Sequence, residues 1–201
     1  MHILLTDILT CPRCGPGFGL ILLADRAEDR RVLAGMLGCS NCREQYAIHD
    51  GIVDFGVAPE SISPSADAAA AVRLAGIMGV TEGPAFLMLA GPASAHAVAI
   101  AQMLEDVEVL TIGAAAAADD GPGINRIYAS GPQLPIASGR VAAVALSGAA
   151  ATALLDEGAR TVSPLGRLVL DPAPPDAAQK LQRHGMRIAA QQDGTAVAVR
   201  G

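Results

Sequence analysis

The sequence predicts an α/β protein in which a small β-rich module precedes a doubly wound, mostly parallel sheet. Three observations predict this arrangement. All four cysteines lie within the first 42 residues, as two Cys-x-x-Cys pairs. A stretch rich in proline and serine follows them, and beyond it short apolar runs alternate with alanine-rich helical segments. We therefore expect a module at residues 1–56, a linker at residues 57–66 and a second domain at residues 67–201.

The composition limits the classes of function. Of the 201 residues, 51% are hydrophobic, and 14 basic against 20 acidic side chains give a net charge of −6. So apolar a chain can bury a core, yet its apolar runs end before the roughly 20 residues of a membrane span. The acidic balance disfavours nucleic acid as a partner. The first residues lack a secretory pattern, so we expect a cytoplasmic protein.

The cysteine spacing predicts a structural zinc site formed by Cys11, Cys14, Cys39 and Cys42. The two pairs are 24 residues apart, which in a cytoplasmic chain favours a metal over a disulfide framework. Two residues between cysteines let one turn point both sulfurs at the metal, and four thiolates leave no position open for water. A redox pair or buried free thiols are the alternatives. A closed site of this kind stabilises a small module and is not catalytic.

The residues beside the cysteines are consistent with this site. Gly15 and Asn41 suit the left-handed turns that such cysteine pairs often need. Arg13 and Arg43 could offset the negative charge of four thiolates on one zinc ion.

The module resembles a known family over residues 5–56. The motifs are Leu-x-Cys-Pro-x-Cys-Gly (Leu9 to Gly15), Leu-x-Cys-x-x-Cys (Leu37 to Cys42) and Tyr-x-Ile-x-Asp-Gly-Ile-x-x-Phe (Tyr46 to Phe55). Together they resemble the zinc ribbon of the methyltransferase-activator subunit, which partners tRNA-, rRNA- and protein-modifying methyltransferases. The resemblance implies a docking and stabilising role with a protein partner, either a methyltransferase or a second copy of the chain.

The second domain reads as strands alternating with helices. The Asp193-Gly194 pair is typical of the turn of a closing antiparallel hairpin. We expect strands at residues 86–90, 107–112, 124–129, 141–146 and 167–170, helices at 67–79, 94–104, 150–162 and 175–184, and the hairpin at 186–200.

This order of elements resembles the Rossmann-like fold of class I S-adenosylmethionine-dependent methyltransferases. The clearest stretches run from Leu134 to Ser147 and from Leu154 to Leu170. The resemblance implies a cofactor cleft at the ends of the first strands of the sheet. The residues that correspond to this cleft are Gly91, Thr111 and Ser130.

The same cleft departs from the family pattern. The turn after the first strand retains one glycine, Gly91, and Pro92 removes a backbone donor. Family members hold the cofactor's ribose and adenine with carboxylates, where this chain has Thr111 and Ser130. Each charged hydrogen bond lost costs roughly 1.5–3 kcal/mol. The sequence contains no recognisable catalytic constellation, so no catalytic residue is predicted.

Two hypotheses follow. In the first, the chain is a non-catalytic zinc-binding adaptor or regulatory protein, a pseudoenzyme that has lost its cofactor-binding carboxylates. In the second, it is an active S-adenosylmethionine-dependent methyltransferase that holds the cofactor through Gly91, Thr111 and Ser130 in an atypical cleft. The degenerate cleft favours the first.

Overall fold

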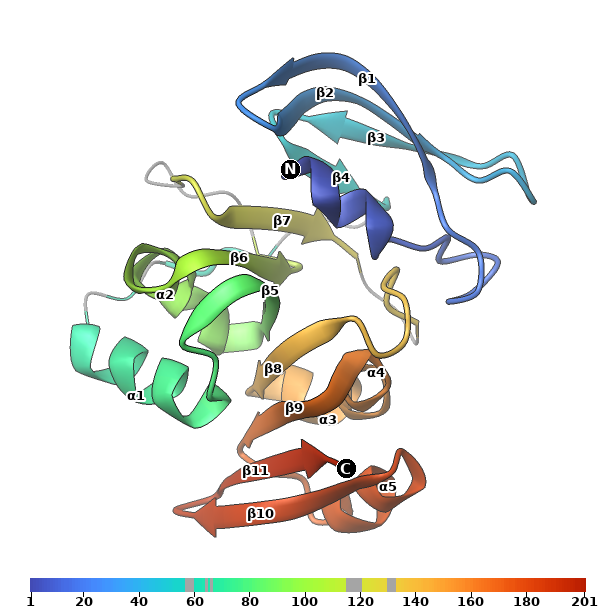
Figure 1. Ribbon diagram of the computed structural model, residues 1–201. Coiled ribbons are helices and arrows are strands. Elements are labelled where there is room, and N and C mark those ends of the chain that lie inside the picture. Colours follow the sequence, from blue (N-terminus) through green and yellow to red (C-terminus); the bar gives the residue numbers. More distant parts are fainter. Residues whose placement is uncertain (57–59, 64, 66, 115–120, 130–132) are drawn as a thin grey trace.

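The fold is organised around one sheet of eleven strands. The computed structural model describes residues 1–56, 60–63, 65, 67–114, 121–129 and 133–201. The strand order is β1-β2-β3-β4-β7-β6-β5-β8-β9-β11-β10. Figure 1 shows the N-terminal strands at one end of this sheet and the C-terminal hairpin at the other.

The N-terminal part of the chain forms the first four strands. These strands pair antiparallel in sequence order. Its elements are η1 (Ile3–Asp7), β1 (Ile21–Glu28), β2 (Arg31–Gly38), β3 (Gln45–His49) and β4 (Ile52–Asp54).

The rest of the chain supplies seven strands and most of the helices. β5 pairs parallel with both β6 and β8, and the C-terminal hairpin joins β9 antiparallel. The elements are α1 (Ala68–Met78), β5 (Glu82–Ala90), η2 (Gly91–His96), α2 (Ala97–Met103), β6 (Glu105–Ile112), β7 (Ile124–Tyr128), β8 (Val141–Ser147), α3 (Ala149–Ala153), α4 (Leu155–Thr161), β9 (Val162–Asp171), α5 (Ala177–Arg183), β10 (Met186–Gln192) and β11 (Thr195–Arg200).

Alternate residues of β5 enter two different cores, one on each face of the sheet. Leu87 and Leu89 pack with buried residues of α1 and α2. Met88 and Ala90 pack in the other core, which includes residues of α4 and α5. Strands that are buried on both faces explain the near-continuous apolar runs of the sequence.

The N-terminal part shares the second of these cores. Leu5, Leu9, Leu37 and Ile48 are buried in the same cluster as Met88 of the central strand. The sheet is also continuous across this junction, because β4 pairs parallel with β7 over Ile52–Asp54 and Arg126–Tyr128. Apolar side chains of the N-terminal part and of the central strand are thus buried in one common core.

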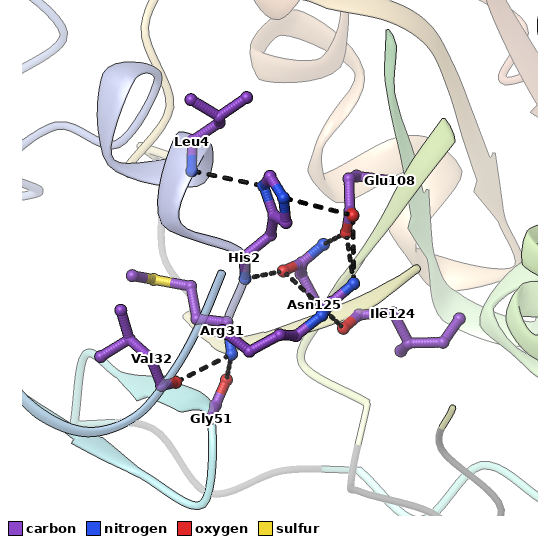
Figure 2. A network of polar contacts seen from close by, with 9 residues as sticks. His2, Leu4, Arg31, Val32, Gly51, Glu108, Ile124 and Asn125 are labelled. Carbon is purple, nitrogen blue, oxygen red and sulfur yellow. Dashed lines mark hydrogen bonds and ion pairs between the residues drawn. The ribbon is translucent and has the colours of Figure 1, made fainter. Parts of the chain in front are cut away.

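A polar network fixes the same junction (Figure 2). Nη2 of Arg31 on β2 donates to both carboxylate oxygens of Glu108 on β6, at 3.0 and 2.9 Å. The Asn125 amide donates to Glu108 Oε2 at 2.7 Å, and its oxygen accepts from the backbone N–H of His2 at 2.6 Å. The network ties the first strands to β6 and β7.

Some details of the fold differ from the sequence-based expectations. The pairing is mixed, parallel from β4 through β9 in sheet order and antiparallel towards both edges. The expected helix at 94–104 is divided into η2 and α2, since the chain makes a 3-10 turn from Gly91 to His96 first. In the part of the chain that the structure describes, no helix is long and apolar enough to cross a membrane.

Candidate metal centre and cofactor edge

The four cysteines lie together between η1 and the β2–β3 turn. Their Sγ atoms all lie within 4.8 Å of one another, and none forms a disulfide. The Sγ atoms of Cys11 and Cys42 are 3.6 Å apart, and those of Cys39 and Cys14 are 3.8 Å apart. A tetrahedral zinc site with Zn–S bonds of about 2.3 Å has sulfurs about 3.8 Å apart. These distances therefore match a closed four-sulfur site.

The two Cys-x-x-Cys turns have the same backbone closure. Gly15 N–H donates to Cys11 O, and Arg43 N–H donates to Cys39 O, both at 2.9 Å. Gly15 and Arg43 both have positive φ angles, of 99° and 61°. The left-handed residue of the second turn is thus Arg43, and the expectation for Asn41 was wrong. The Asn41 side chain instead donates to Cys14 Sγ at 3.2 Å.

Neighbouring groups act on the protonation of the thiols. Backbone N–H groups of Cys42 and Asn41 lower the pKa of Cys39 to about 7. At Cys42 the Glu44 N–H favours the thiolate, but burial and the other three thiols raise the pKa to about 12. In the absence of a cation, the Cys39 thiol therefore ionises at a lower pH than the Cys42 thiol. Binding of a divalent metal would favour the thiolate form of all four cysteines and would release their protons.

Two further side chains complete the surroundings. The Tyr46 hydroxyl lies 3.4 Å from Cys11 Sγ inside the core, where burial raises the pKa of Tyr46. Arg13 is largely exposed and donates to Glu44 Oε2 at 3.0 Å. Its charge is shared with a carboxylate on the surface, which weakens the expected compensation of the thiolates.

At the edge of the sheet where the sequence predicts the cofactor cleft, the turn after β5 makes hydrogen bonds to Ser147 at the end of β8. Gly91 has a φ of 69°, and a Cβ atom there would lie 2.2 Å from Ser147 O at the end of β8. Ala93 N–H donates to Ser147 Oγ at 2.5 Å, and Ser147 Oγ donates to Ala90 O at 3.3 Å. Gly91 is therefore needed for the close approach of this turn to β8.

The other two predicted cleft residues are placed differently. Thr111 is fully buried within β6, and its hydroxyl lies 3.4 Å from Arg126 Nη1. Ser130 lies outside the described residues. The structure therefore does not bring Gly91 and Thr111 to one exposed surface.

Two described residues of the expected linker, Glu60 and Ser65, lie at the same edge of the sheet. Glu60 N–H donates to Gly113 O, directly after β6, at 2.7 Å. Ser65 N–H donates to Ala95 O, in the turn after β5, at 2.8 Å. In open α/β sheets, ligands bind outside the carboxyl ends of the strands. Here the chain's own segment makes hydrogen bonds at the carboxyl ends of β5 and β6.

A cavity of about 620 Å³ lies beside the β5 turn, between α1 and the C-terminal hairpin. Pro92, Ala93 and Ser147 line it, whereas Gly91 and Thr111 do not. Nothing in the sequence indicates this cavity, because its walls come from separate segments between Ala70 and Val197 that carry no motif.

The comparisons with known proteins give a fold. No protein-family model matches the chain, and no curated protein matches it either. Among solved structures, one of a Haloferax volcanii Trm112 methyltransferase activator in complex with a methyltransferase matches at 14% identity and a TM-score of 0.51, covering 64% of this chain and 87% of that chain. A geranyl diphosphate C-methyltransferase from Streptomyces coelicolor A3(2), in complex with S-adenosyl-L-homocysteine, matches at 13% identity and 0.55, covering 67% and 76%.

The chain has a methyltransferase-like α/β fold. The [4+2]-cyclase SpnF also matches, at 15% identity and a TM-score of 0.52, over 63% of this chain and 59% of that chain. At these identities the likeness establishes the fold, and function must be argued from the site. The expectation of a methyltransferase-like α/β fold is confirmed at this level.

Proposed function

We propose that the chain is a non-catalytic zinc-binding adaptor or regulatory protein. In this proposal residues 1–56 form a structural zinc ribbon, residues 57–66 a linker and residues 67–201 a methyltransferase-like domain whose cofactor site is lost. The zinc ligands are Cys11, Cys14, Cys39 and Cys42.

The observation that carries this proposal is that, among the described residues, the groups expected to hold the cofactor are buried or are hydrogen-bonded within the chain. The turn after β5 donates Ala93 N–H to Ser147, Thr111 is buried, and the connecting segment bonds to Gly113 and Ala95. The residues that end β6 and directly follow it, Thr111-Ile112-Gly113, carry no carboxylate themselves. A nucleoside would have to displace internal hydrogen bonds and would gain no charged acceptor from these three residues.

The placement of β4 supports a role for the ribbon within its own chain. β4 is paired on both sides, with β3 and with β7, so its edge is not open to a separate protein. The solved complex of a Trm112 activator with a methyltransferase contains an activator and a methyltransferase as partners. By analogy, the ribbon would stabilise the methyltransferase-like domain to which it is fused. A further protein partner, a methyltransferase or a second copy, would bind at another surface.

The alternative is an active S-adenosylmethionine-dependent methyltransferase. The observation that favours it is the fold itself, since a neighbour of known structure binds S-adenosyl-L-homocysteine. This alternative needs the connecting segment to leave Gly113 and Ala95 before the cofactor enters.

A methyl-transfer assay separates the two. The zinc-loaded chain is incubated with radiolabelled S-adenosylmethionine and mixed protein, RNA and small-molecule acceptors, beside a known methyltransferase as positive control. We expect no transfer above the level without protein. Transfer that depends on the chain would contradict the proposal.

A further inference from the structure

The cavity beside the β5 turn occupies a favourable place for a ligand. It has a volume of about 620 Å³ and includes the ends of β8 and β9, at Ser147 and Asp171. The strand order reverses between β5 and β8, because β6 and β7 extend to one side and β9 to the other. The crevice at such a switch point is where open α/β sheets bind ligands.

The cavity has an apolar floor. Ala145 of β8, Val169 of β9 and Val197 of β11 face it from the sheet, and Leu74 and Ile77 line it from α1. Ala145 and Val169 are almost completely buried. Because these side chains are small, they leave space for a ligand. The apolar floor can bury a short aliphatic group of that ligand.

Charges of opposite sign stand on opposite walls. Arg73 comes from α1, and among the described residues its guanidinium has no ion pair or hydrogen bond. Asp171 comes from the end of β9, where Oδ1 accepts from Thr195 Oγ1 at 3.2 Å and Oδ2 has no partner in the described chain. Asp193 of the hairpin turn adds a second carboxylate to the same side.

We propose that this cavity binds a small zwitterion of the amino-acid type. The ligand carboxylate pairs with Arg73, its ammonium group pairs with Asp171, and its aliphatic side chain lies on the floor formed by Ala145, Val169 and Val197. A simple anion would be repelled by the two aspartates and a simple cation by Arg73. This proposal is independent of the loss of the cofactor site.

Three probes of the same shape test the charge requirement by calorimetry. L-Leucine carries both charges, leucinamide lacks the carboxylate, and 4-methylpentanoate lacks the ammonium group. We expect leucine to bind the zinc-loaded chain about tenfold more tightly than either analogue, because each analogue loses one charge-assisted contact.

Two isosteric variants assign the contacts. Arg73→Gln should weaken leucine about tenfold and should not weaken leucinamide, because the variant also removes the repulsion between Arg73 and this cation. Asp171→Asn should weaken leucine about tenfold and should not weaken 4-methylpentanoate, because the variant also removes the repulsion between Asp171 and this anion. The control variants Arg187→Gln and Asp7→Asn alter exposed side chains outside the cavity and should change nothing. Melting temperatures verify that every variant is folded.

The proposal is overturned if leucine fails to bind the folded protein up to about 10 mM, or if both cavity variants bind it as the wild type does. S-adenosylmethionine, which has a zwitterionic end, forms a separate arm. If it binds and neither cavity variant weakens it, the proposed loss of the cofactor site fails, while the leucine results still decide the zwitterion site.

Discussion

Arg31 holds Glu108 across 77 positions of the sequence, with Nη2 bonded to both carboxylate oxygens and Nη1 donating to Ile124 O at 2.9 Å. Both side chains are only 19% exposed. The pair joins β2 of the N-terminal part to β6 at the centre of the methyltransferase-like fold. Arg31 begins β2, whereas Cys39 follows the last residue of that strand, so the pair and the cysteine cluster lie at opposite ends of β2.

Removing this pair should destabilise the whole chain. Arg31→Ala leaves the largely buried Glu108 carboxylate without its cation, which should cost roughly 2–3 kcal/mol. The loss is measured as the decrease in the free energy of unfolding of the zinc-loaded protein in urea. The exposed Arg13–Glu44 pair, at 69% and 46% exposure, is the control. Arg13→Ala should leave the free energy of unfolding almost unchanged. Equal effects of the two variants would contradict the role given to Arg31.

A metal ion held by the four cysteines should order residues 135–137, which lie outside the N-terminal part of the chain. Thr10 N–H, next to Cys11, donates to Pro135 O at 2.9 Å, and Ala137 N–H donates to Ile8 O at 2.8 Å. Chelation of the metal, or Cys42→Ser, should therefore accelerate hydrogen exchange of the Ala137 amide. The same treatments should lower the melting temperature and the zinc content.

The control for the metal variant is Ser40→Ala, an exposed position in the same turn. It should retain zinc and the slow exchange at Ala137. Central strand β8 should exchange slowly in all samples. If Ala137 is indifferent to the metal, the coupling is absent.

Two glycines should respond oppositely to alanine. At Gly91 a Cβ would meet Ser147 O at 2.2 Å on a backbone of positive φ. Gly91→Ala should cost about 2–3 kcal/mol. Gly76 is exposed in α1 with nothing within 4 Å of such a Cβ. Gly76→Ala should gain about 0.5–1 kcal/mol. A harmless Gly91→Ala, measured by thermal unfolding, would mean that the turn is not packed on β8.

Acid should destabilise the junction through His2. Burial lowers the pKa of His2 below its ordinary 6.5, with Glu108 opposing the shift and Arg31 adding to it. The Met1 amine donates to Gly51 O and Val32 O, and burial, with Arg31 adding, lowers its pKa from 8.0 to about 6. Both groups bind protons more readily in the unfolded chain, so stability falls as pH decreases from about 8 towards 6 and below.

The variant His2→Gln isolates the histidine contribution. Leu4 N–H donates to His2 Nδ1 at 3.3 Å, and the glutamine keeps a polar acceptor for this N–H while it removes the titrating ring. With excess zinc in both samples, the wild type should lose more stability than the variant below about pH 6.5. Parallel stability curves would show that His2 does not contribute.

How far the sequence predicts this fold depends on the range of the interactions. The cysteine spacing predicts the four-sulfur cluster, because each turn is closed within five residues. The apolar runs at residues 86–90, 107–112 and 141–146 predict the central strands, since burial on both faces is recorded locally.

Long-range partners could not be predicted in the same way. Val53 of β4 pairs with Ile127 of β7, and the sequence between them carries no motif that indicates this pairing. The hydrogen bonds that Ser147 makes with Ala93 and Ala90, which close the β5 turn, depend on where β8 ends. Thr111 has a polar side chain, and only its place in the sheet shows that it faces Arg126 and not solvent. Arg43 adopts the left-handed conformation that the residue types suggested for Asn41, because its position in the turn decides the backbone angle.

The central claim is that the methyltransferase-like fold no longer holds its cofactor. Calorimetric titration of the zinc-loaded chain with S-adenosylmethionine and S-adenosylhomocysteine tests it, with zinc measured on the same sample. We predict no binding up to about 1 mM alongside about one zinc per chain. Saturable binding at about micromolar strength would contradict the account and direct attention to the segment bonded to Gly113 and Ala95.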